Sequence, residues 1–504
     1  MSRLLGIDSG STNVKAAVFD SEEGCIDTAS VECRDLFTDG DRVEVPMAAY
    51  WDAVVQCISR IRERGRVSLG DIRALSVSSQ GVTFVPVDER GDEIGRAIYL
   101  HDQRAVVEAA VIREAFGADV LYDTAGQPAV NAMFEATRLL WLRRHEPARF
   151  ARIHKVLLVH DFLVHRLTGE FVTVPSIQSS SLLMDIRTRS WWPQMLDLVG
   201  LSPQQLPRLC AHGEAVGLVS ARAARETGLS PDTVVVAGGI DQVCGMIGVR
   251  NTAKGIISES TGSVLALHTV SEEPFHQEES GIFNFCAFGD RSYALIPVCP
   301  TAGAALRWFK ESFCGEEAAR AEAEKADVYD LLTREAAAAP PGSEGLLMLP
   351  YLSGSGSPTP DLRARGVFYG ITLAHGKGHF IRALLESVAC LLRSNMETLK
   401  SAGMGFTEIR SFGGGSRSRL WNQIKADLCG LPVRASRVAE TGCLGAAVLA
   451  GVGCGAYADI EEGGRALAGL EEPLAPDASR RAVSEDLYGR YENLRRAVQP
   501  LHAR

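Results

Sequence analysis

The chain has 504 residues, 46% of them hydrophobic and 23% charged, a composition typical of a soluble globular protein rather than a disordered one. Its 62 acidic and 52 basic residues give a net charge of −10. This charge argues against a nucleic-acid partner but not against a phosphorylated ligand, because backbone N–H groups bind phosphate even in an acidic protein. The opening letters MSRLLGID lead directly into a strand, and the longest low-charge runs fall short of the ~20 residues of a membrane span. We therefore expect a cytoplasmic protein with no membrane partner.

A strand, a turn and a second strand open the chain with the letters LLGIDSGSTNVKAAVFD, residues 4–20. Asp8 ends the first strand, and Gly10 with small polar residues forms the turn. A plain hairpin explains this pattern. A turn that binds phosphate and metal explains it as well, with Gly10 letting N–H groups face an anion while Asp8 faces a cation. This stretch alone leaves both interpretations open.

Helices and strands alternate through the first half of the chain, which predicts an α/β fold. The pattern predicts helices over residues 47–63 and 102–116 and a strand over residues 72–79. A further strand over residues 233–237 runs through two glycines to Asp241 at a helix start. Such a position projects a side chain into a cleft at the end of a sheet, although a helix cap would also explain the aspartate.

A second unit begins after Asn251, where the letters GIISESTGSVLALHTV repeat the opening design of strand, polar turn and strand. A duplicated architecture, with one turn from each half facing a shared nucleotide, explains this repeat; coincidence is the alternative. We expect two domains, residues 1–245 and 246–504. The acidic, alanine-rich segment that ends at Pro340 and Pro341 is predicted to be surface helix and loop, and we assign it no chemistry.

The C-terminal part continues with a long helix predicted over residues 378–401 and then a strand, three glycines (residues 413–415) and a helix from Ser416. Glycines before a helix N-terminus allow a nucleotide to approach the backbone closely, and the helix dipole favours its phosphates. Glycine-rich turns are also common for purely structural reasons. The letters ETGCLGAAVLAGVGCGAY predict a helix of small residues packed tightly against a neighbour.

Taken together and in this order, the Asp8 turn, Asp241, the ESTGS turn and the GGGSRSRLWNQ turn resemble the FGGY carbohydrate kinases over nearly the whole chain. The letters NAMFEATRLLWLRRHEPARF are similar to the family's first signature, and GVFYGITLAHGKGHFIRALLE to its second. The resemblance implies two ribonuclease-H-like domains of the actin, hexokinase and Hsp70 superfamily. ATP and a small-molecule sugar would lie in the cleft between them, and a homodimer is expected.

The resemblance also implies roles for individual residues. Asp8 would hold Mg²⁺ through water, and Asp241 would be the catalytic base. Phosphoryl transfer requires mainly positioning and charge neutralisation, so N–H turns, a metal and one carboxylate are sufficient. Residues expected to contact ATP are Gly10, Ser11, Thr12 and Lys15 in the first domain and Thr261, Gly262, Gly303, Gly414, Gly415 and Ser418 in the second. Residues expected at the sugar are Gln80, Gly81, Val82, Asp102, Arg104 and Gln242.

The chain departs from known family members beside Gln80. Xylulokinases carry Met-His after the matching glutamine and glycerol kinases carry Arg-Glu, whereas this chain has Gly81 and Val82. We therefore expect a roomier and less polar pocket here. The Asp102-x-Arg104 pattern resembles the family's Asp-x-Arg, although a helix N-cap explains Asp102 equally well.

The sequence therefore predicts an ATP-dependent kinase acting on a primary hydroxyl of a ketose, with ketopentoses such as xylulose first. A glycerol- or erythritol-type polyol kinase is the alternative within the family. A sugar-independent ATPase related to actin and Hsp70 is a different class. A dinucleotide oxidoreductase is disfavoured because no Gly-x-Gly-x-x-Gly follows the first strand.

Overall fold

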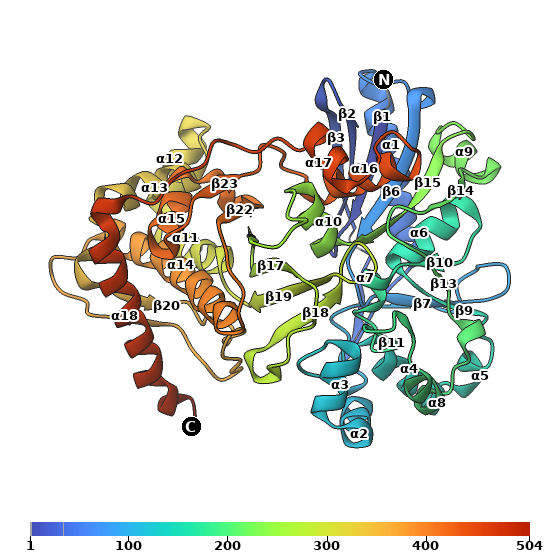
Figure 1. Ribbon diagram of the computed structural model, residues 1–504, viewed down its shortest axis with the longest axis horizontal. Helices are drawn as coiled ribbons and strands as arrows, with labels where there is room; N and C mark the ends of the chain where they lie inside the picture. The colour runs from blue at the N-terminus through green and yellow to red at the C-terminus, as the bar shows by residue number, and fades with distance from the viewer. Residues whose placement is uncertain (1–2, 34, 504) are drawn as a thin grey trace.

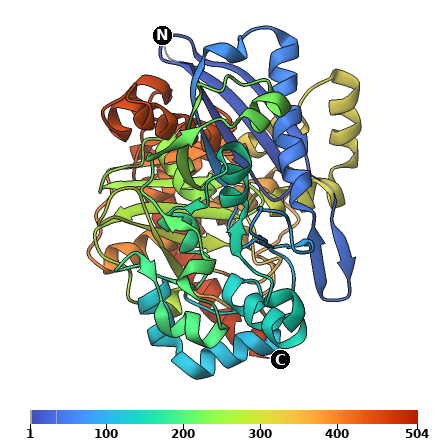
Figure 2. The same cartoon turned by 90° about the vertical axis from the view of Figure 1, so that its right-hand side faces the viewer.

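The computed structural model describes residues 3–33 and 35–503 of the chain. Figure 1 shows two lobes side by side, each built around a six-stranded sheet. The two chain termini lie at opposite ends of the molecule, as the perpendicular view in Figure 2 also shows. Within the described residues, no helix is both long and apolar enough to cross a membrane.

The sheet of the first lobe has the strand order β14 (Ala215–Leu218), β15 (Val234–Ile240), β6 (Ile72–Ser79), β1 (Arg3–Ser9), β2 (Asn13–Asp20) and β3 (Gly24–Glu32). β1, β2 and β3 are antiparallel neighbours, whereas β6 runs parallel to β1 and β15 parallel to β6. Parallel strands end at the same edge of a sheet. The residues after β1, β6 and β15 therefore lie next to one another.

The sheet of the second lobe repeats this plan. Its order is β18 (Ile282–Cys286), β19 (Tyr293–Cys299), β17 (Leu265–Ser271), β16 (Ile256–Thr261), β22 (Glu408–Phe412) and β23 (Val433–Ala435). β16, β17 and β19 are antiparallel neighbours, and β22 runs parallel to β16. The duplicated α/β architecture predicted from the two strand-turn-strand repeats is thus confirmed.

Helices with one apolar face cover these sheets. In α1 (Met47–Arg64), buried Tyr50, Val54, Ile58 and Ile61 recur every three or four residues, as in an amphipathic helix, and Gly65 ends the helix in a left-handed conformation. The other helices packed on the first sheet are α6 (Val159–Thr168), α10 (Asp241–Gly248) and α16 (Thr441–Gly453). The second lobe contains α11 (Gly303–Phe313), α12 (Gly315–Glu324), α13 (Val328–Ala338), α14 (Lys377–Ser401), α15 (Arg419–Cys429) and α18 (Arg481–Val498).

α16 follows the second sheet in sequence but packs in the first lobe, beside β1 and α10 (Figure 1). The backbones approach so closely that a Cβ on Gly6 would lie 1.8 Å from the carbonyl oxygen of Cys443, and one on Gly445 would lie 1.9 Å from that of Cys244. The prediction of a small-residue helix packed tightly against a neighbour is confirmed. The C-terminal chain therefore completes the core of the first lobe.

Smaller elements surround the two main sheets. A five-stranded sheet contains β4 (Phe37–Asp39), β5 (Arg42–Val45), β8 (Ala97–Ile98), β7 (Phe84–Val87) and β9 (Lys155–Leu158). Three two-stranded sheets pair β10 (Val172–Thr173) with β13 (Arg208–Leu209), β11 (Met184–Asp185) with β12 (Ser190–Trp191), and β20 (Leu347–Leu349) with β21 (Val367–Tyr369). The remaining α-helices are α2 (Val106–Phe116), α3 (Ala118–Ala125), α4 (Glu135–His145), α5 (Pro147–Phe150), α7 (Pro175–Gln178), α8 (Pro193–Val199), α9 (Ala221–Thr227) and α17 (Ile460–Leu467).

Two predicted helix starts are wrong. The helix predicted from Asp102 begins at Val106, because the Asp102 carboxylate accepts the backbone N–H of Arg104 and holds a turn before the helix. The helix predicted from Ser416 begins at Arg419, after a 3₁₀ turn over Gly414–Arg417. Ser418 is its N-cap, with Oγ accepting from the N–H of Trp421 at 3.2 Å.

Candidate active site

Two acidic residues meet where the parallel strands of the first sheet end. Asp8 is the sixth residue of β1, and Asp241 begins α10 directly after β15. Ser78, on β6, donates a hydrogen bond from Oγ to Oδ1 of Asp8 at 2.7 Å. Burial raises the pKa of Asp241 to about 7, and the charge of Asp8 contributes to this rise. The two carboxylates are therefore close enough for the charge of one to affect the other.

Burial also raises the pKa of Asp8, against the hydrogen bond from Ser78 and the positive charge of Lys15. Two half-buried carboxylates whose negative charges repel one another are a suitable oxygen donor set for a hard divalent cation. In the described part of the chain, no cluster of three or more acidic, histidine or cysteine residues could hold a metal ion. Mg²⁺ is usually held by one or two carboxylates together with water and substrate phosphates, so this site fits it.

The first turn joins β1 and β2 and is held from behind. The N–H of Gly10 donates to the carbonyl of Asn13 at 3.0 Å, and the hydroxyl of Tyr99 donates to the carbonyl of Ser11 at 3.0 Å. Thr12, at the tip, is exposed. Lys15 on β2 reaches across to Glu440, which precedes α16, with Nζ and Oε2 2.6 Å apart. The turn and the C-terminal chain are thus joined at the site.

The second turn borders a cleft of about 340 Å³ in the second lobe. All six residues predicted for the nucleotide in this domain line it: Thr261, Gly262, Gly303, Gly414, Gly415 and Ser418. Lining residues that sequence reasoning missed include Ser263, Arg307, Asp327, Tyr329, Asp330, Thr333 and Arg417. Several of these lie in the acidic, alanine-rich segment to which no chemistry was assigned. Asp327 and Tyr329 of that segment border the cleft, although no motif in the segment marks them.

Close backbone contact shapes this cleft. The N–H of Gly303, the first residue of α11, donates to the carbonyl of Gly262 at 2.9 Å. A Cβ on Gly303 would lie 2.3 Å from that carbonyl oxygen, so only glycine fits. The N-terminus of α11 therefore begins at the second turn, and its first N–H groups, of Gly303 and Ala304, are paired with the carbonyls of Gly262 and Ser263 in that turn.

A buried ion pair supports the second turn from below. Nζ of Lys425, on α15, lies 2.6 Å from Oε1 of Glu259, on β16, and 3.1 Å from Oγ1 of Thr261. Oγ1 of Thr261 donates to the other carboxylate oxygen of Glu259, and Ser411 donates to Oε1. The hydroxyl of Thr261 therefore donates to Glu259 and accepts from Lys425, which fixes this side chain below the turn.

Asp102 and Arg104 form a buried pair. Both oxygens of Asp102 are used: Oδ1 accepts from Nε of Arg104 at 2.9 Å, and Oδ2 accepts from Nη2 of Arg104 at 2.8 Å and from the N–H of Val43 at 2.7 Å. Asp102 is not a helix N-cap, since α2 begins four residues later. Nη1 of Arg104 is buried and has no hydrogen-bond partner among the described residues.

Gln80, Gly81 and Val82 follow β6 at the same sheet edge. Gln80 donates from Nε2 to the hydroxyl of Tyr50 at 2.7 Å, while its Oε1 is buried without a partner in the described structure. Val82 has a left-handed φ of 59°. This is strained for a β-branched residue, and Arg138, fully buried, donates to the Val82 carbonyl.

The room predicted beside Gly81 is filled by another segment. A Cβ on Gly81 would lie 2.5 Å from Oγ of Ser180, which itself accepts from the N–H of Val82 at 3.3 Å. The space that a side chain at position 81 would enter is therefore occupied, while the comparison with a xylulokinase pocket stays a prediction. Ser180 lies 98 positions from Val82 in sequence, and no local signal points to it.

Gln242 contacts Asp241 through its backbone and His268 through its side chain. Its backbone N–H donates to Oδ1 of Asp241 at 2.7 Å, and its Oε1 is 2.6 Å from Nε2 of His268, on β17 of the second sheet. Sequence reasoning did not identify His268.

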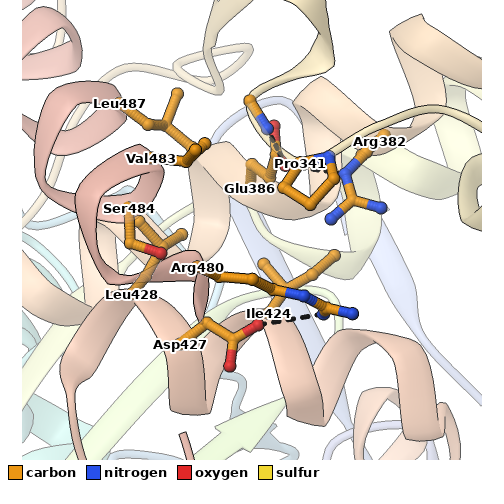
Figure 3. A pocket seen from close by; sticks show the side chains of 11 residues that line it. Pro341, Arg382, Glu386, Ile424, Asp427, Leu428, Arg480, Val483, Ser484 and Leu487 are labelled. Carbon is orange, nitrogen blue, oxygen red and sulfur yellow. Dashed lines mark hydrogen bonds and ion pairs between the residues drawn. The ribbon is translucent and has the colours of Figure 1, made fainter. Parts of the chain in front are cut away.

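A second hollow, shown in Figure 3, lies between α14, α15 and α18. Its volume is about 10 Å³, room for about one water molecule. Both of its cations are paired with its own carboxylates, Arg382 with Glu386 at 2.8 Å and Arg480 with Asp427 at 3.1 Å. This hollow is a packing seam rather than a ligand site.

Comparisons with known proteins agree with this arrangement. Residues 3–248 match the N-terminal domain, and residues 258–454 the C-terminal domain, of the FGGY family of carbohydrate kinases. The chain is 29% identical to an autoinducer-2 kinase of Klebsiella pneumoniae, covering 98% of this chain and 94% of that protein. It is 28% identical to a xylulose kinase of Staphylococcus epidermidis, covering 99% and 98%. A ligand-bound xylulose kinase from Lactobacillus acidophilus has the same fold, with a TM-score of 0.88 at 23% identity over 99% of this chain and 98% of that one.

Proposed function

The chain belongs to the FGGY family of carbohydrate kinases, which transfer phosphate from ATP to an alcohol group of a sugar, and we propose that its acceptor is a primary hydroxyl of a ketose. A ketopentose such as xylulose is the first candidate, because xylulose kinases are among the relatives that match over nearly the full chain. The relatives also include kinases named for other substrates, so the sugar is the part of this proposal that needs the experiment.

The observation that carries the proposal is the position of Asp241. It lies at the edge where β1, β6 and β15 end, with a pKa near 7 that suits a general base at neutral pH. Asp241 would accept the proton of the attacking hydroxyl. Because the transition state of phosphoryl transfer is loose, this proton leaves late and a single carboxylate is sufficient.

The phosphates would be held by backbone groups rather than by a covalent intermediate. Gly10, Ser11, Thr12 and Lys15 would surround the terminal phosphate, and the cleft in the second lobe would hold the rest of the nucleotide. Asp8 would bind Mg²⁺, which when bound neutralises charge on the phosphates. The ammonium group of Lys15 would add a positive charge, and its ion pair with Glu440 would fix its position.

The sugar that accepts the phosphate would be bound at the first sheet. Buried polar atoms without partners are rare in folded proteins and call for an explanation. Oε1 of Gln80 and Nη1 of Arg104 are two such atoms within the described residues, one an acceptor and one a donor. Hydroxyls of a bound sugar would satisfy both. Asp102, whose oxygens are already used, would orient Arg104 instead of contacting the sugar.

The test is a coupled assay of ADP release with a panel of ketoses, deoxy sugars and polyols, each with and without Mg²⁺. We expect release to require both Mg²⁺ and a sugar, and to be fastest with a ketopentose. Glycerol or erythritol as the sole good substrate would favour the polyol kinase. Strong hydrolysis that no added sugar changes would contradict sugar phosphorylation and favour an ATPase related to actin and Hsp70.

A further inference from the structure

A histidine of the second lobe contacts the residue next to the proposed base. His268 lies on β17 and is fully buried, with its ring 5.7 Å from that of Phe412. Its Nε2 is 2.6 Å from Oε1 of Gln242, the second residue of α10. A hydrogen bond this short between two largely enclosed groups has little competition from water.

The hydrogen-bond pattern determines which atoms donate. The backbone N–H of Gln242 donates to Oδ1 of Asp241 at 2.7 Å. The side-chain carbonyl oxygen of Gln242 lies 2.6 Å from Nε2 of His268, and an amide oxygen only accepts. His268 Nε2 must then carry a proton and donate it.

The other side of the imidazole supports this tautomer. Burial lowers the pKa of His268 to about 4, so the ring is neutral and carries one proton. Nδ1 lies 3.5 Å from Oγ of Ser258, and that oxygen accepts from Nδ2 of Asn251 at 2.9 Å. The Ser258 hydroxyl hydrogen is free to point at Nδ1, which is compatible with a ring proton on Nε2.

We propose that His268 is a positioning residue for phosphoryl transfer: its Nε2–H fixes the side chain of Gln242, and Gln242, whose backbone N–H donates to Oδ1 of Asp241, fixes that carboxylate. This inference rests on the proposed function of Asp241. β17 is the strand that follows the turn with Thr261 and Gly262, so the lobe that holds the nucleotide also orients the base in the other lobe. Misplacement of a reacting group by about 1 Å can cost ~10²-fold in rate.

The test compares two substitutions of similar size and polarity. His268→Gln can place an amide donor near the position of Nε2, whereas His268→Asn reaches only the position of Nδ1. We expect His268→Asn to lower kcat by about 10- to 100-fold with KM for sugar and the Kd of Mg-ADP nearly unchanged, and His268→Gln to retain most of kcat. Equal kcat in the parent and both variants would overturn the proposal, and so would equal losses in both.

A double-mutant cycle tests whether His268 acts through Gln242. Once Gln242→Leu has removed the amide, adding His268→Asn should cost almost nothing further, whereas full additivity of the two losses would overturn the proposal.

Nitrogen NMR of the imidazole gives a measurement that does not depend on activity. The parent should show the Nε2-protonated tautomer, and the Nε2 signal should shift in Gln242→Leu; no shift overturns the inference. If the parent phosphorylates no sugar, the proposed function fails while the NMR result still decides the contact.

Discussion

Nζ of Lys425 lies 2.6 Å from Oε1 of Glu259, and both side chains are completely buried beneath the turn that carries Thr261. The pair comes from α15 and β16 and joins the helix after the three glycines to the strand before the second turn. Two charged side chains that are buried away from water are stable only while each neutralises the charge of the other. The second turn therefore depends on a contact between segments 166 positions apart.

Breaking this pair should destabilise the protein strongly. Lys425→Met leaves the Glu259 carboxylate buried without its cation, and we expect a loss of about 3–5 kcal/mol in the free energy of unfolding. Lys400→Met is the matched control, because Lys400 pairs with Glu397 at the surface and such pairs contribute less than about 1 kcal/mol. Denaturant unfolding of the parent and both variants measures the difference. Equal losses in the two variants would contradict the role given to the buried pair.

Asp241→Asn should abolish turnover while leaving binding intact. Asparagine preserves the size of the side chain and a hydrogen bond to the acceptor, but it cannot take up the proton. We expect kcat to fall ~10²- to 10⁴-fold. Calorimetric titrations with the sugar and with Mg-ADP should give dissociation constants close to those of the parent. Turnover within a few-fold of the parent would show that Asp241 is only a structural residue at the start of α10.

The same variant should be more stable than the parent at high pH. Burial raises the pKa of Asp241 from 3.8 to about 7, so the folded protein binds this proton more tightly than the unfolded chain does. The stability contributed by the carboxyl therefore falls as pH rises through this range. We expect the advantage of Asp241→Asn to grow by about 2–3 kcal/mol between pH 5 and pH 8. A stability difference that does not change with pH would contradict the raised pKa.

Gly81→Ala should be costly because Ser180 occupies the space that its Cβ needs. Overpacking of this kind costs about 1–3 kcal/mol. Adding Ser180→Gly should recover part of the loss, since it removes the clashing hydroxyl. Gly489→Ala, in the middle of α18 with nothing within 4 Å of the new Cβ, should instead be stabilising. Thermal unfolding of the parent and these three variants tests this, and a Gly81→Ala protein as stable as the parent would contradict it.

Local patterns in the sequence determined a large part of this fold. A strand, a small-residue turn and a second strand occur twice, and they form the central hairpins β1–β2 and β16–β17 of two similar sheets. Asp241 follows an apolar strand through two glycines, and the strand and helix on either side of it form as predicted. Such features depend on residues within one turn or one strand of each other, so they can be recognised without knowing the rest of the chain.

Contacts between distant segments were decided only by the tertiary structure. Ser180 against Gly81, His268 against Gln242, Lys15 against Glu440, and the return of α16 to the first lobe each join segments that no periodicity connects. Asp327 and Tyr329 became lining residues of the cleft in the second lobe in the same way. A buried polar or charged group is stable only with its partner in place, and that partner is set by how whole elements pack, which a local pattern does not encode.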